Sequence, residues 1–296
     1  MIREIRLSDK EDVLRISSQI WEGDDYVINV FDRWVTSNTG IFAGYWDAGK
    51  LIGFGRMRFL TPTDIWLEAL RKDPQTKIKG IGYKISKYYM DKLKGKEINS
   101  IRFSTYFDNT ASITLNEKLG FIKILTLSMK EFEISSNQVK TIDNSIITDI
   151  DLSELDKYIK NSNYLFKTKG FISKGWIIRQ YSKELINDYF TKNRYVVYKI
   201  HNEIKGAMLI SDVEYQDIYW LSFIEAENKK IFNELIKYAE NEAITNNFRS
   251  IQLLVPDIKK LKQYVDCYGF KSWEQNDDFL VYELPRTEIN QITGRK

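Results

Sequence analysis

The chain has little of two residue types that carry much of protein chemistry. Its 296 residues include one cysteine, Cys267, and one histidine, His201. One cysteine excludes an intramolecular disulfide and agrees with a reducing compartment. One histidine removes most metal sites and catalytic triads, and the segment 201–203 is typical of a solvated turn between two strands. We therefore predict no metal site and no catalytic role for His201.

Long apolar runs, prolines and low-complexity segments are also scarce. Four residues are proline, 43% are hydrophobic and 29% are charged, which is typical of a folded globular protein. The longest apolar stretches, such as residues 195–198, are far shorter than the roughly 20 residues that span a bilayer. Residues 1–6 alternate charged and apolar side chains, unlike the apolar core of a signal peptide. We expect a protein without a membrane span that stays in the cytoplasm.

Neither sign of charge is in large excess. The 44 lysines and arginines against 41 aspartates and glutamates give a net charge of +3, and both signs are mixed along the chain. Nucleic-acid-binding proteins gather basic residues on one face or in a recognised module, and this chain has neither pattern. We expect no nucleic-acid partner.

The length is about twice that of a usual domain, so two domains are expected. In the first half, hydrophobic periodicity predicts alternating strands and helices, which favours an α/β fold. The predicted strands cover 2–7, 41–46, 51–59, 65–70, 100–105 and 121–132, and the predicted helices cover 13–20, 26–35, 83–93 and 110–118.

The second half repeats the order of elements in the first. Gly120-Phe121 matches Gly269-Phe270 at a displacement of 149, and residues 45–53 resemble residues 198–206 around a hairpin turn. Together these matches favour a duplication over an unrelated second α/β domain. We predict a first domain at 1–134, a linker at 135–145 and a second domain at 146–296.

The segment Lys77-Ile78-Lys79-Gly80-Ile81-Gly82 joins a predicted strand to a predicted helix. Glycines allow a ligand to approach the backbone, and the free amides and dipole of a helix start attract an anion. Two lysines add positive charge for a ligand with several phosphates. The segment lacks the Gly-Lys-Ser/Thr ending of a loop that binds nucleotide triphosphates, and it lacks the third glycine of a dinucleotide-binding loop. Alone it is compatible either with a pyrophosphate cradle or with an ordinary solvated turn.

Two motifs together resemble the GNAT superfamily of acetyl-CoA-dependent N-acetyltransferases. Residues 67–82 look like its Gln/Arg-x-x-Gly-x-Gly/Ala motif with the preceding strand, although Lys77 replaces the usual first residue. Residues 109–121, from Asn109 to Gly120-Phe121, look like its second motif. The resemblance implies two tandem domains of mixed, mostly antiparallel sheet flanked by helices. It also implies that acetyl-CoA enters a V-shaped opening between splayed parallel strands at 65–70 and 100–105.

The resemblance further implies which residues contact the coenzyme. Backbone groups of one strand would pair with the pantetheine arm, loop amides would hold the pyrophosphate, and the second motif would line the far side. The strand residues are Leu70, Arg71 and Lys72. The loop residues are Lys77, Ile78, Lys79, Gly80, Ile81, Gly82 and Tyr83, and the residues of the second motif are Asn109, Ser112 and Asn116. A primary amine of a small molecule or protein would then attack the thioester directly in a ternary complex.

Proton transfer is where the sequence departs from the family. Glu68 is the candidate general base because it lies on the strand that faces the acetyl group, although it could equally be a structural hydrogen-bonding residue. Asn116 stands where many members have a tyrosine that protonates the leaving thiolate, and asparagine cannot do so. Asp24 and Asp25, between the first two helices, could attract a cationic acceptor or form a solvated acidic loop.

The second half lacks both motifs. Its loop at 225–230 has no glycine and carries two glutamates, and Ile258 stands where the displacement places Asn109. We expect no coenzyme binding there. Three functions remain open for the chain: an active N-acetyltransferase, a catalytically silent acyl-CoA sensor, and a structural protein that no longer binds coenzyme.

Overall fold

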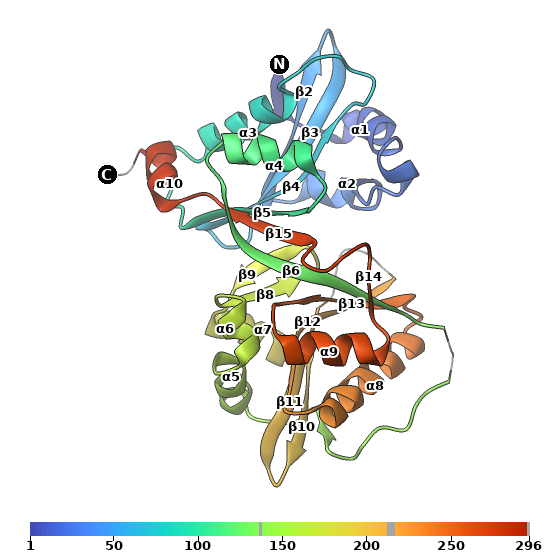
Figure 1. The fold of residues 1–296 in the computed structure, drawn as a ribbon. Helices are drawn as coiled ribbons and strands as arrows, with labels where there is room; N and C mark the ends of the chain where they lie inside the picture. Colours follow the sequence, from blue (N-terminus) through green and yellow to red (C-terminus); the bar gives the residue numbers. More distant parts are fainter. Residues whose placement is uncertain (136–137, 212–216, 295–296) are drawn as a thin grey trace. The chain divides into compact units, whose positions relative to one another are not determined.

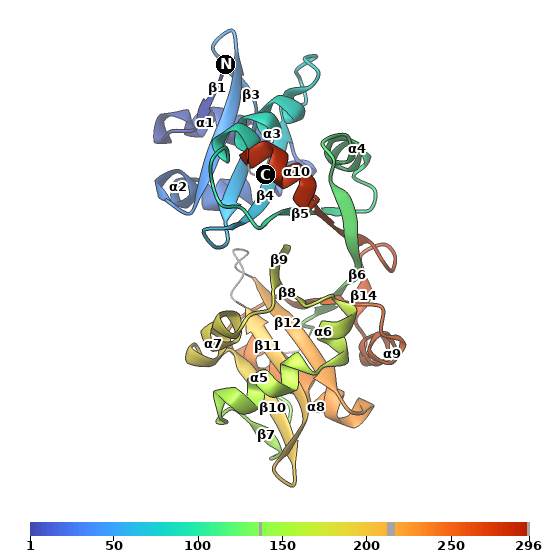
Figure 2. The ribbon, with the colours of Figure 1, turned by 90° about the vertical axis from the view of Figure 1, so that its left-hand side faces the viewer.

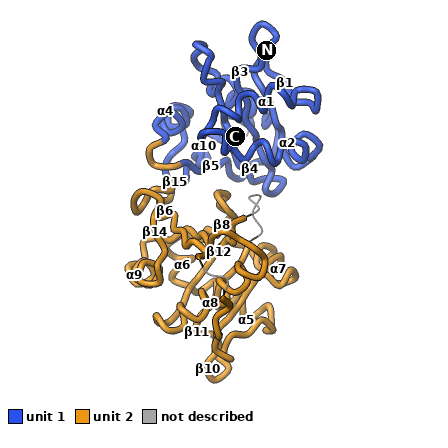
Figure 3. The backbone as a smooth tube through the Cα atoms, turned by 90° about the vertical axis from the view of Figure 1, so that its right-hand side faces the viewer, with its two compact units in different colours: residues 1–105, 109–124, 281–296 blue, residues 106–108, 125–280 orange. Residues whose placement is uncertain are grey.

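The computed structural model describes residues 1–135, 138–211 and 217–294. Two compact units are present (Figure 3), and neither is one continuous stretch. Unit 1 contains Met1–Thr105, Asn109–Ile124 and Val281–Lys296, and unit 2 contains Tyr106–Asp108 and Leu125–Leu280. The domain boundaries predicted from the sequence follow the repeat, whereas the compact units include segments from both halves. Residues 136 and 137 of the predicted linker lie outside the described residues.

Unit 1 is built on a sheet with the strand order β1-β2-β3-β4-β5-β15. Strands β1 to β4 pair antiparallel, and β4 and β5 are parallel. The strands are β1 (Ile2–Glu4), β2 (Gly40–Asp47), β3 (Lys50–Phe59), β4 (Asp64–Lys72), β5 (Ser100–Tyr106) and β15 (Phe279–Glu283). The helices are α1 (Lys10–Ser17), α2 (Val27–Thr36), α3 (Ile81–Lys92), α4 (Thr110–Lys118) and α10 (Arg286–Thr293).

Helices α1 and α2 cover one face of this sheet and α3 covers the other (Figure 2). Helix α2 has an apolar stripe because buried residues recur every three or four positions. Its buried residues are Val27, Val30, Phe31 and Trp34. On the opposite face, the Tyr89 hydroxyl of α3 donates to the Gly55 carbonyl and accepts from the Ala43 amide. Apolar packing and a buried tyrosine thus hold the two helical layers on the sheet.

Strands β4 and β5 diverge. Their parallel ladder covers three pairs, from Asp64–Ser100 to Trp66–Arg102. Both strands continue beyond that ladder, β4 to Lys72 and β5 to Tyr106. The prediction of splayed central parallel strands is confirmed.

Unit 2 has a sheet with the order β6-β13-β12-β11-β10-β7, and β14 also pairs with β6 (Figures 1 and 2). Its strands are β6 (Ile122–Glu133), β7 (Ile146–Ile147), β10 (Tyr195–Ile200), β11 (Glu203–Ser211), β12 (Ile218–Ala226), β13 (Ser250–Val255) and β14 (Lys271–Ser272), with a separate hairpin of β8 (Phe171–Lys174) and β9 (Ile177–Gln180). Its helices are α5 (Leu152–Lys160), α6 (Asn163–Lys167), α7 (Lys183–Thr191), α8 (Lys229–Thr245) and α9 (Lys259–Tyr268).

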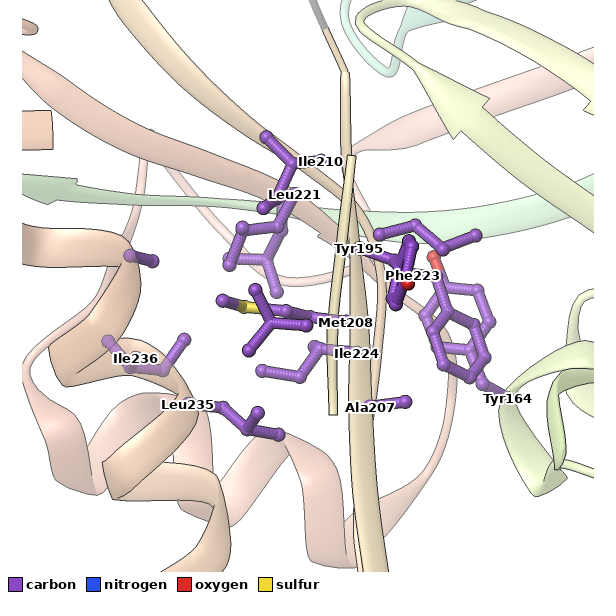
Figure 4. Packing of buried hydrophobic residues seen from close by; sticks show 14 of the residues in the cluster. Tyr164, Tyr195, Ala207, Met208, Ile210, Leu221, Phe223, Ile224, Leu235 and Ile236 are labelled. Carbon is purple, nitrogen blue, oxygen red and sulfur yellow. The ribbon is translucent and has the colours of Figure 1, made fainter. Parts of the chain in front are cut away.

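The core of unit 2 lies on both faces of its sheet (Figure 4). Leu235 and Ile236 of α8 lie beside Met208 on one face, and Tyr164 and Phe223 lie together on the other. Its parallel strands β12 and β13 also stop pairing early, after Leu221–Leu253. The predicted repetition of the fold is confirmed. Among the described residues, no helix is long and apolar enough to cross a membrane.

The end of the chain completes unit 1. The rings of Tyr282 and Phe103 are stacked with centroids 5.1 Å apart. The Leu284 amide donates to the Ile101 carbonyl at 2.9 Å, and the Gly95 amide donates to the Thr293 carbonyl at 3.0 Å. Residues 281–294 thus support β5 on the edge that does not face β4.

Replacement of Tyr282 with alanine is expected to destabilise unit 1 by about 3 to 5 kcal/mol, because it removes a buried ring and leaves a cavity. Denaturant unfolding followed by circular dichroism measures the change. Tyr83→Ala is the matched control because Tyr83 is 40% exposed whereas Tyr282 is 2% exposed, and its cost should stay within about 0.5 kcal/mol. Equal losses in the two variants would contradict the supporting role of the C-terminal segment.

Candidate active site

A β-bulge in β4 lies where β5 has already diverged. Arg56 of β3 pairs with Glu68, and Phe54 pairs with Arg71, so Ala69 and Leu70 together oppose a single residue of β3. Ala69 has a φ of 55°, in the left-handed region that a residue with a side chain rarely adopts. The bulge and the divergence together leave this part of β4 without regular ladder partners on either edge.

The turn after β4 is organised by Asp73, whose side chain is fully buried. Its carboxylate accepts hydrogen bonds from Arg15 Nη1 at 2.6 Å and from the Gln75 amide at 2.9 Å, and Lys50 Nζ lies 3.3 Å away. Burial alone would raise the pKa of Asp73, but these partners outweigh burial and hold the pKa below its ordinary value of 3.8. A charged anchor therefore fixes the start of the glycine-containing turn.

Helix α3 begins at this turn with two glycines in different roles. Gly80 is the N-cap and has a φ of 75°, with no side chain capping the helix. A Cβ added at Gly80 would meet no heavy atom within 4 Å, so open space lies beside it. A Cβ at Gly82 would lie 2.8 Å from Leu115 Cδ2 and 3.1 Å from Leu70 Cδ2. Gly80 thus supplies the turn, and Gly82 allows the close approach of α3 to β4 and α4.

The other predicted coenzyme residues of this turn differ in exposure. Lys72, Lys77 and Lys79 are exposed, as is Tyr83, whereas Ile78 is partly buried and Ile81 is buried. The exposed lysines place positive charge around the start of α3, next to amides that a side chain does not cap. Such a turn can bind a phosphorylated ligand.

The second predicted motif forms the start of α4. Asn109 is the N-cap, and its Oδ1 accepts from the Ser112 amide at 3.2 Å. Asn116 is buried, and its Nδ2 donates to the Ser112 carbonyl at 2.9 Å. Asn109 and Asn116 therefore have structural roles in α4, and Leu115 of the same helix reaches the Gly82 contact. Contacts of Asn109, Ser112 and Asn116 with a coenzyme remain a prediction.

Glu68 lies in a buried ion pair. Arg56 Nη1 donates to Glu68 Oε1 at 2.6 Å, and the two side chains are 3% and 10% exposed. The Arg56 guanidinium lies over the Trp34 ring of α2 at 4.6 Å, and its Nη2 donates to Thr39 Oγ1 at 3.3 Å. The carboxylate is thus on the α2-facing side of β4, immediately before the bulge.

Arg71 lies on the same side of β4, immediately after the bulge. It binds Asp25 with two hydrogen bonds, from Nη2 to Oδ1 at 3.0 Å and from Nε to Oδ2 at 3.2 Å. Its guanidinium lies 4.4 Å from the Trp21 ring, which is 61% exposed. Asp25 is buried, whereas Asp24 is exposed. The prediction that these carboxylates attract a cationic acceptor stays open, and the geometry favours Asp24 because Arg71 already balances Asp25.

The corresponding positions of unit 2 contain different chemistry. The Tyr164 hydroxyl lies 3.0 Å from the Leu254 carbonyl of β13 and 3.4 Å from the Ser222 carbonyl of β12. It therefore bridges the two diverging strands. Helix α8 begins with Asn228, whose side chain accepts from the Ile231 amide. A tyrosine hydroxyl thus lies between the two strands, and a side chain caps the helix start. That unit 2 binds no coenzyme stays a prediction.

Sequence reasoning missed Arg56, Asp73 and the bulge at Ala69. A lone charged residue within the apolar run 51–57 is the signal for Arg56. The sequence carries no comparable signal for a bulge, because backbone conformation at Ala69 depends on pairing with β3. Among the described residues, no group of three or more histidine, cysteine, aspartate or glutamate side chains could hold a metal ion.

The splayed strands, the bulge and the glycine turn define an N-acyltransferase fold. Residues 3–121 match the model of the acetyltransferase (GNAT) family. None of the curated proteins matches the sequence.

Several solved structures share the fold over nearly the whole chain. A GCN5-related N-acetyltransferase from Sphaerobacter thermophilus has a TM-score of 0.65 at 10% identity, covering 96% of this chain and 94% of that one. A Thermoplasma acidophilum protein provisionally described as an acetyltransferase has a TM-score of 0.60 at 16% identity, with coverage of 96% and 98%. A tandem GNAT protein from the clavulanic acid biosynthesis pathway has a TM-score of 0.57 at 8% identity, with coverage of 96% and 98%. At these identities the likeness shows the fold.

Asp73→Asn is expected to lower stability at neutral pH by about 1 to 2 kcal/mol, since Arg15 and Lys50 are partly exposed and solvent screens their charges. Because folding lowers the pKa of Asp73, its carboxylate contributes fully to the free energy of unfolding above the pKa it has in the unfolded chain. This contribution is lost as the pH falls below 3.8. The variant should therefore lose stability less steeply below pH 3.8 than the wild type, as measured by urea unfolding at several pH values.

Asp12→Asn is the control for this prediction. Asp12 binds the same Arg15 at 3.2 Å, but its side chain is 38% exposed whereas that of Asp73 is fully buried. Its removal should cost less than about 0.5 kcal/mol. A pH profile of Asp73→Asn parallel to that of the wild type would contradict the assignment.

Proposed function

We propose that the protein transfers an acetyl group from acetyl-CoA to a primary amine in a ternary complex. The GNAT fold supports N-acyltransferase activity in general. The observation that carries the finer proposal is in unit 1. The β4–β5 ladder ends at Trp66–Arg102, and β4 then leads to the start of α3, where Gly80 is the N-cap and no side chain caps the amides. The strand edge that β5 leaves is suited to an extended arm that contains amides, and the helix amides that no side chain caps are suited to a pyrophosphate.

The residues present fit such a coenzyme. Backbone groups of Leu70, Arg71 and Lys72 would pair with the pantetheine arm on the edge of β4 where the β5 ladder has ended, while Arg71 and Lys72 keep their pairing with β3 on the other edge. Amides from Lys77 to Tyr83 would hold the pyrophosphate, with open space beside Gly80. Lys77 and Lys79 would add charge at the surface. Asn109, Ser112 and Asn116 of α4 would line the other side.

In the reaction, the amine nitrogen bonds to the acetyl carbonyl carbon and the carbon–sulfur bond breaks. Glu68 would accept the proton that the amine loses, directly or through water. A backbone amide near Leu70 would stabilise the negative charge that develops on the carbonyl oxygen. The thiolate would take its proton from solvent, because Asn116 cannot supply one.

A catalytically silent acyl-CoA sensor is the alternative function. The observation in its favour is Asn116, whose amide is hydrogen-bonded within α4 in place of the family's acidic tyrosine. A sensor keeps the coenzyme contacts and lacks turnover. Both candidate functions require unit 1, and neither requires a coenzyme in unit 2.

The coenzyme site is tested with two glycine variants that have matched backbone strain. Gly80 and Gly95 have φ values of 75° and 74°, and an added Cβ meets no heavy atom within 4 Å at either position. Alanine should cost each about 1 to 2 kcal/mol of stability. Isothermal titration calorimetry should show a roughly tenfold weaker acetyl-CoA Kd for Gly80→Ala, equivalent to about 1.4 kcal/mol. Gly95→Ala should bind like the wild type, and equal affinity of all three proteins would contradict the proposed cradle.

Turnover separates the enzyme from the sensor. The wild-type protein is incubated with acetyl-CoA, either alone or together with one amine at a time, and free thiol is measured over time. The amines are spermidine, glucosamine, lysine and tyramine. An active N-acetyltransferase releases thiol faster with at least one amine than without any amine. Saturable acetyl-CoA binding without amine-dependent thiol release across primary amines would favour the sensor.

A further inference from the structure

We propose that Arg56 is a positioning residue, which holds the Glu68 carboxylate for the amine acceptor. This inference rests on the proposed function and adds a residue to it. The established features of the fold do not require the Arg56–Glu68 pair, and the evidence for that comes from the second copy of the fold in the same chain.

The pair is a rigid contact between neighbouring strands. Arg56 and Glu68 are direct cross-strand partners in the β3–β4 ladder, and their nearest side-chain atoms lie 2.6 Å apart. Trp34 covers the guanidinium and Thr39 binds its second nitrogen. Arginine holds a carboxylate in a fixed orientation because its donors are planar and pre-organised. Glu68, whose own stem is flexible, is thereby held beside the bulge.

Burial makes this pair expensive for the fold. The side chains are 3% and 10% exposed, so both charges have lost most of their hydration. The attraction within a buried pair often does no more than offset that loss, and apolar replacements of similar volume can be as stable. A buried ion pair therefore calls for a reason other than stability.

Unit 2 shows what the same fold uses without charges. In each unit a buried tryptophan is the third residue of the strand, β4 or β12, and belongs to the third pair of the parallel ladder. Trp66 lies opposite Arg102, and Trp220 lies opposite Gln252. Two residues further along stand Glu68 in unit 1 and Ser222 in unit 2.

The partner strand gives the same result. Gly53 pairs with Lys72 in unit 1, and Gly206 pairs with Ala226 in unit 2. Three residues further along stand Arg56 and Leu209. Leu209 and Ser222 are both fully buried. Leu209 pairs with Phe223 because the register shifts at Ser222, so the two positions do not form a cross-strand pair in unit 2, and neutral side chains occupy both. At these positions, which the structure describes in both units, the charged pair occurs in the unit with the glycine turn.

The location of the pair connects it to the proposed reaction. Glu68 is the last β4 residue before the bulge, and the ladder with β5 ended two residues earlier. A carboxylate there lies on the strand that would face the acetyl group. Arg56, one strand away, reaches the reaction only through Glu68, which is why we assign it a positioning role.

The experiment removes both charges and keeps the volume. The double variant Arg56→Met/Glu68→Leu is compared with the wild type in thiol release from acetyl-CoA with the best amine among spermidine, glucosamine, lysine and tyramine. We expect an unfolding midpoint no lower than that of the wild type and an unchanged acetyl-CoA Kd. The amine-dependent kcat should fall by about 10² to 10⁴, the usual contribution of a positioned base.

Single variants separate positioning from structure. Arg56→Met should lower kcat and leave the KM for acetyl-CoA unchanged, and Arg56→Lys should restore part of kcat because it returns a cation to the same place. Arg58→Met, two residues along the same strand, is the control for loss of an arginine and should keep wild-type kcat.

Three results would overturn the inference. A double variant that keeps kcat within about threefold of the wild type shows that the pair is dispensable for turnover. A double variant that unfolds or loses acetyl-CoA binding shows that the pair serves the fold. Failure of Arg56→Lys to exceed Arg56→Met in kcat excludes positioning by a cation. Absence of amine-dependent turnover in the wild type overturns the proposed function itself, so the two failures are distinguishable.

Discussion

The early end of the parallel ladder between β4 and β5 is the constraint on which the rest of unit 1 depends. Beyond Trp66 and Arg102 the two strands no longer pair with each other, and backbone amides and carbonyls away from water need hydrogen-bond partners. Unit 2 has the same divergence and fills it from within, because the Tyr164 hydroxyl reaches carbonyls of both strands. In unit 1 we propose that a coenzyme lies along the part of β4 that no longer pairs with β5. On this proposal, one topological feature has two solutions in a single chain.

Charge follows the same division between the units. On the α2-facing side of β4, unit 1 has two ion pairs, Arg56–Glu68 before the bulge and Arg71–Asp25 after it. At the first of these positions unit 2 has neutral side chains. Stability alone does not account for this difference in charge, since both units have the same arrangement of strands and buried charges are costly. The proposed reaction, which moves a proton and uses an amine substrate, would give these charges a function.

The local features of the site were predictable from the sequence, and the features that depend on strand pairing were not. The Gly80 turn is encoded by neighbouring residues, so its motif located it, and the splayed strands followed from the family resemblance. Asn109 was predicted as a coenzyme contact, and the structure shows it as the N-cap of α4. The bulge at Ala69 and the Arg56–Glu68 pair depend on the register between β3 and β4, which no short motif encodes. Asp25 shows the same limit, because its partner Arg71 lies 46 residues away.

The most distant dependence is on the end of the chain. Strand β5 diverges from β4 along one edge and lies beside β15 along the other. Residues 281–284 hold that edge through the Tyr282–Phe103 stack and the Leu284–Ile101 hydrogen bond. The segment that completes unit 1 therefore follows unit 2 in the sequence.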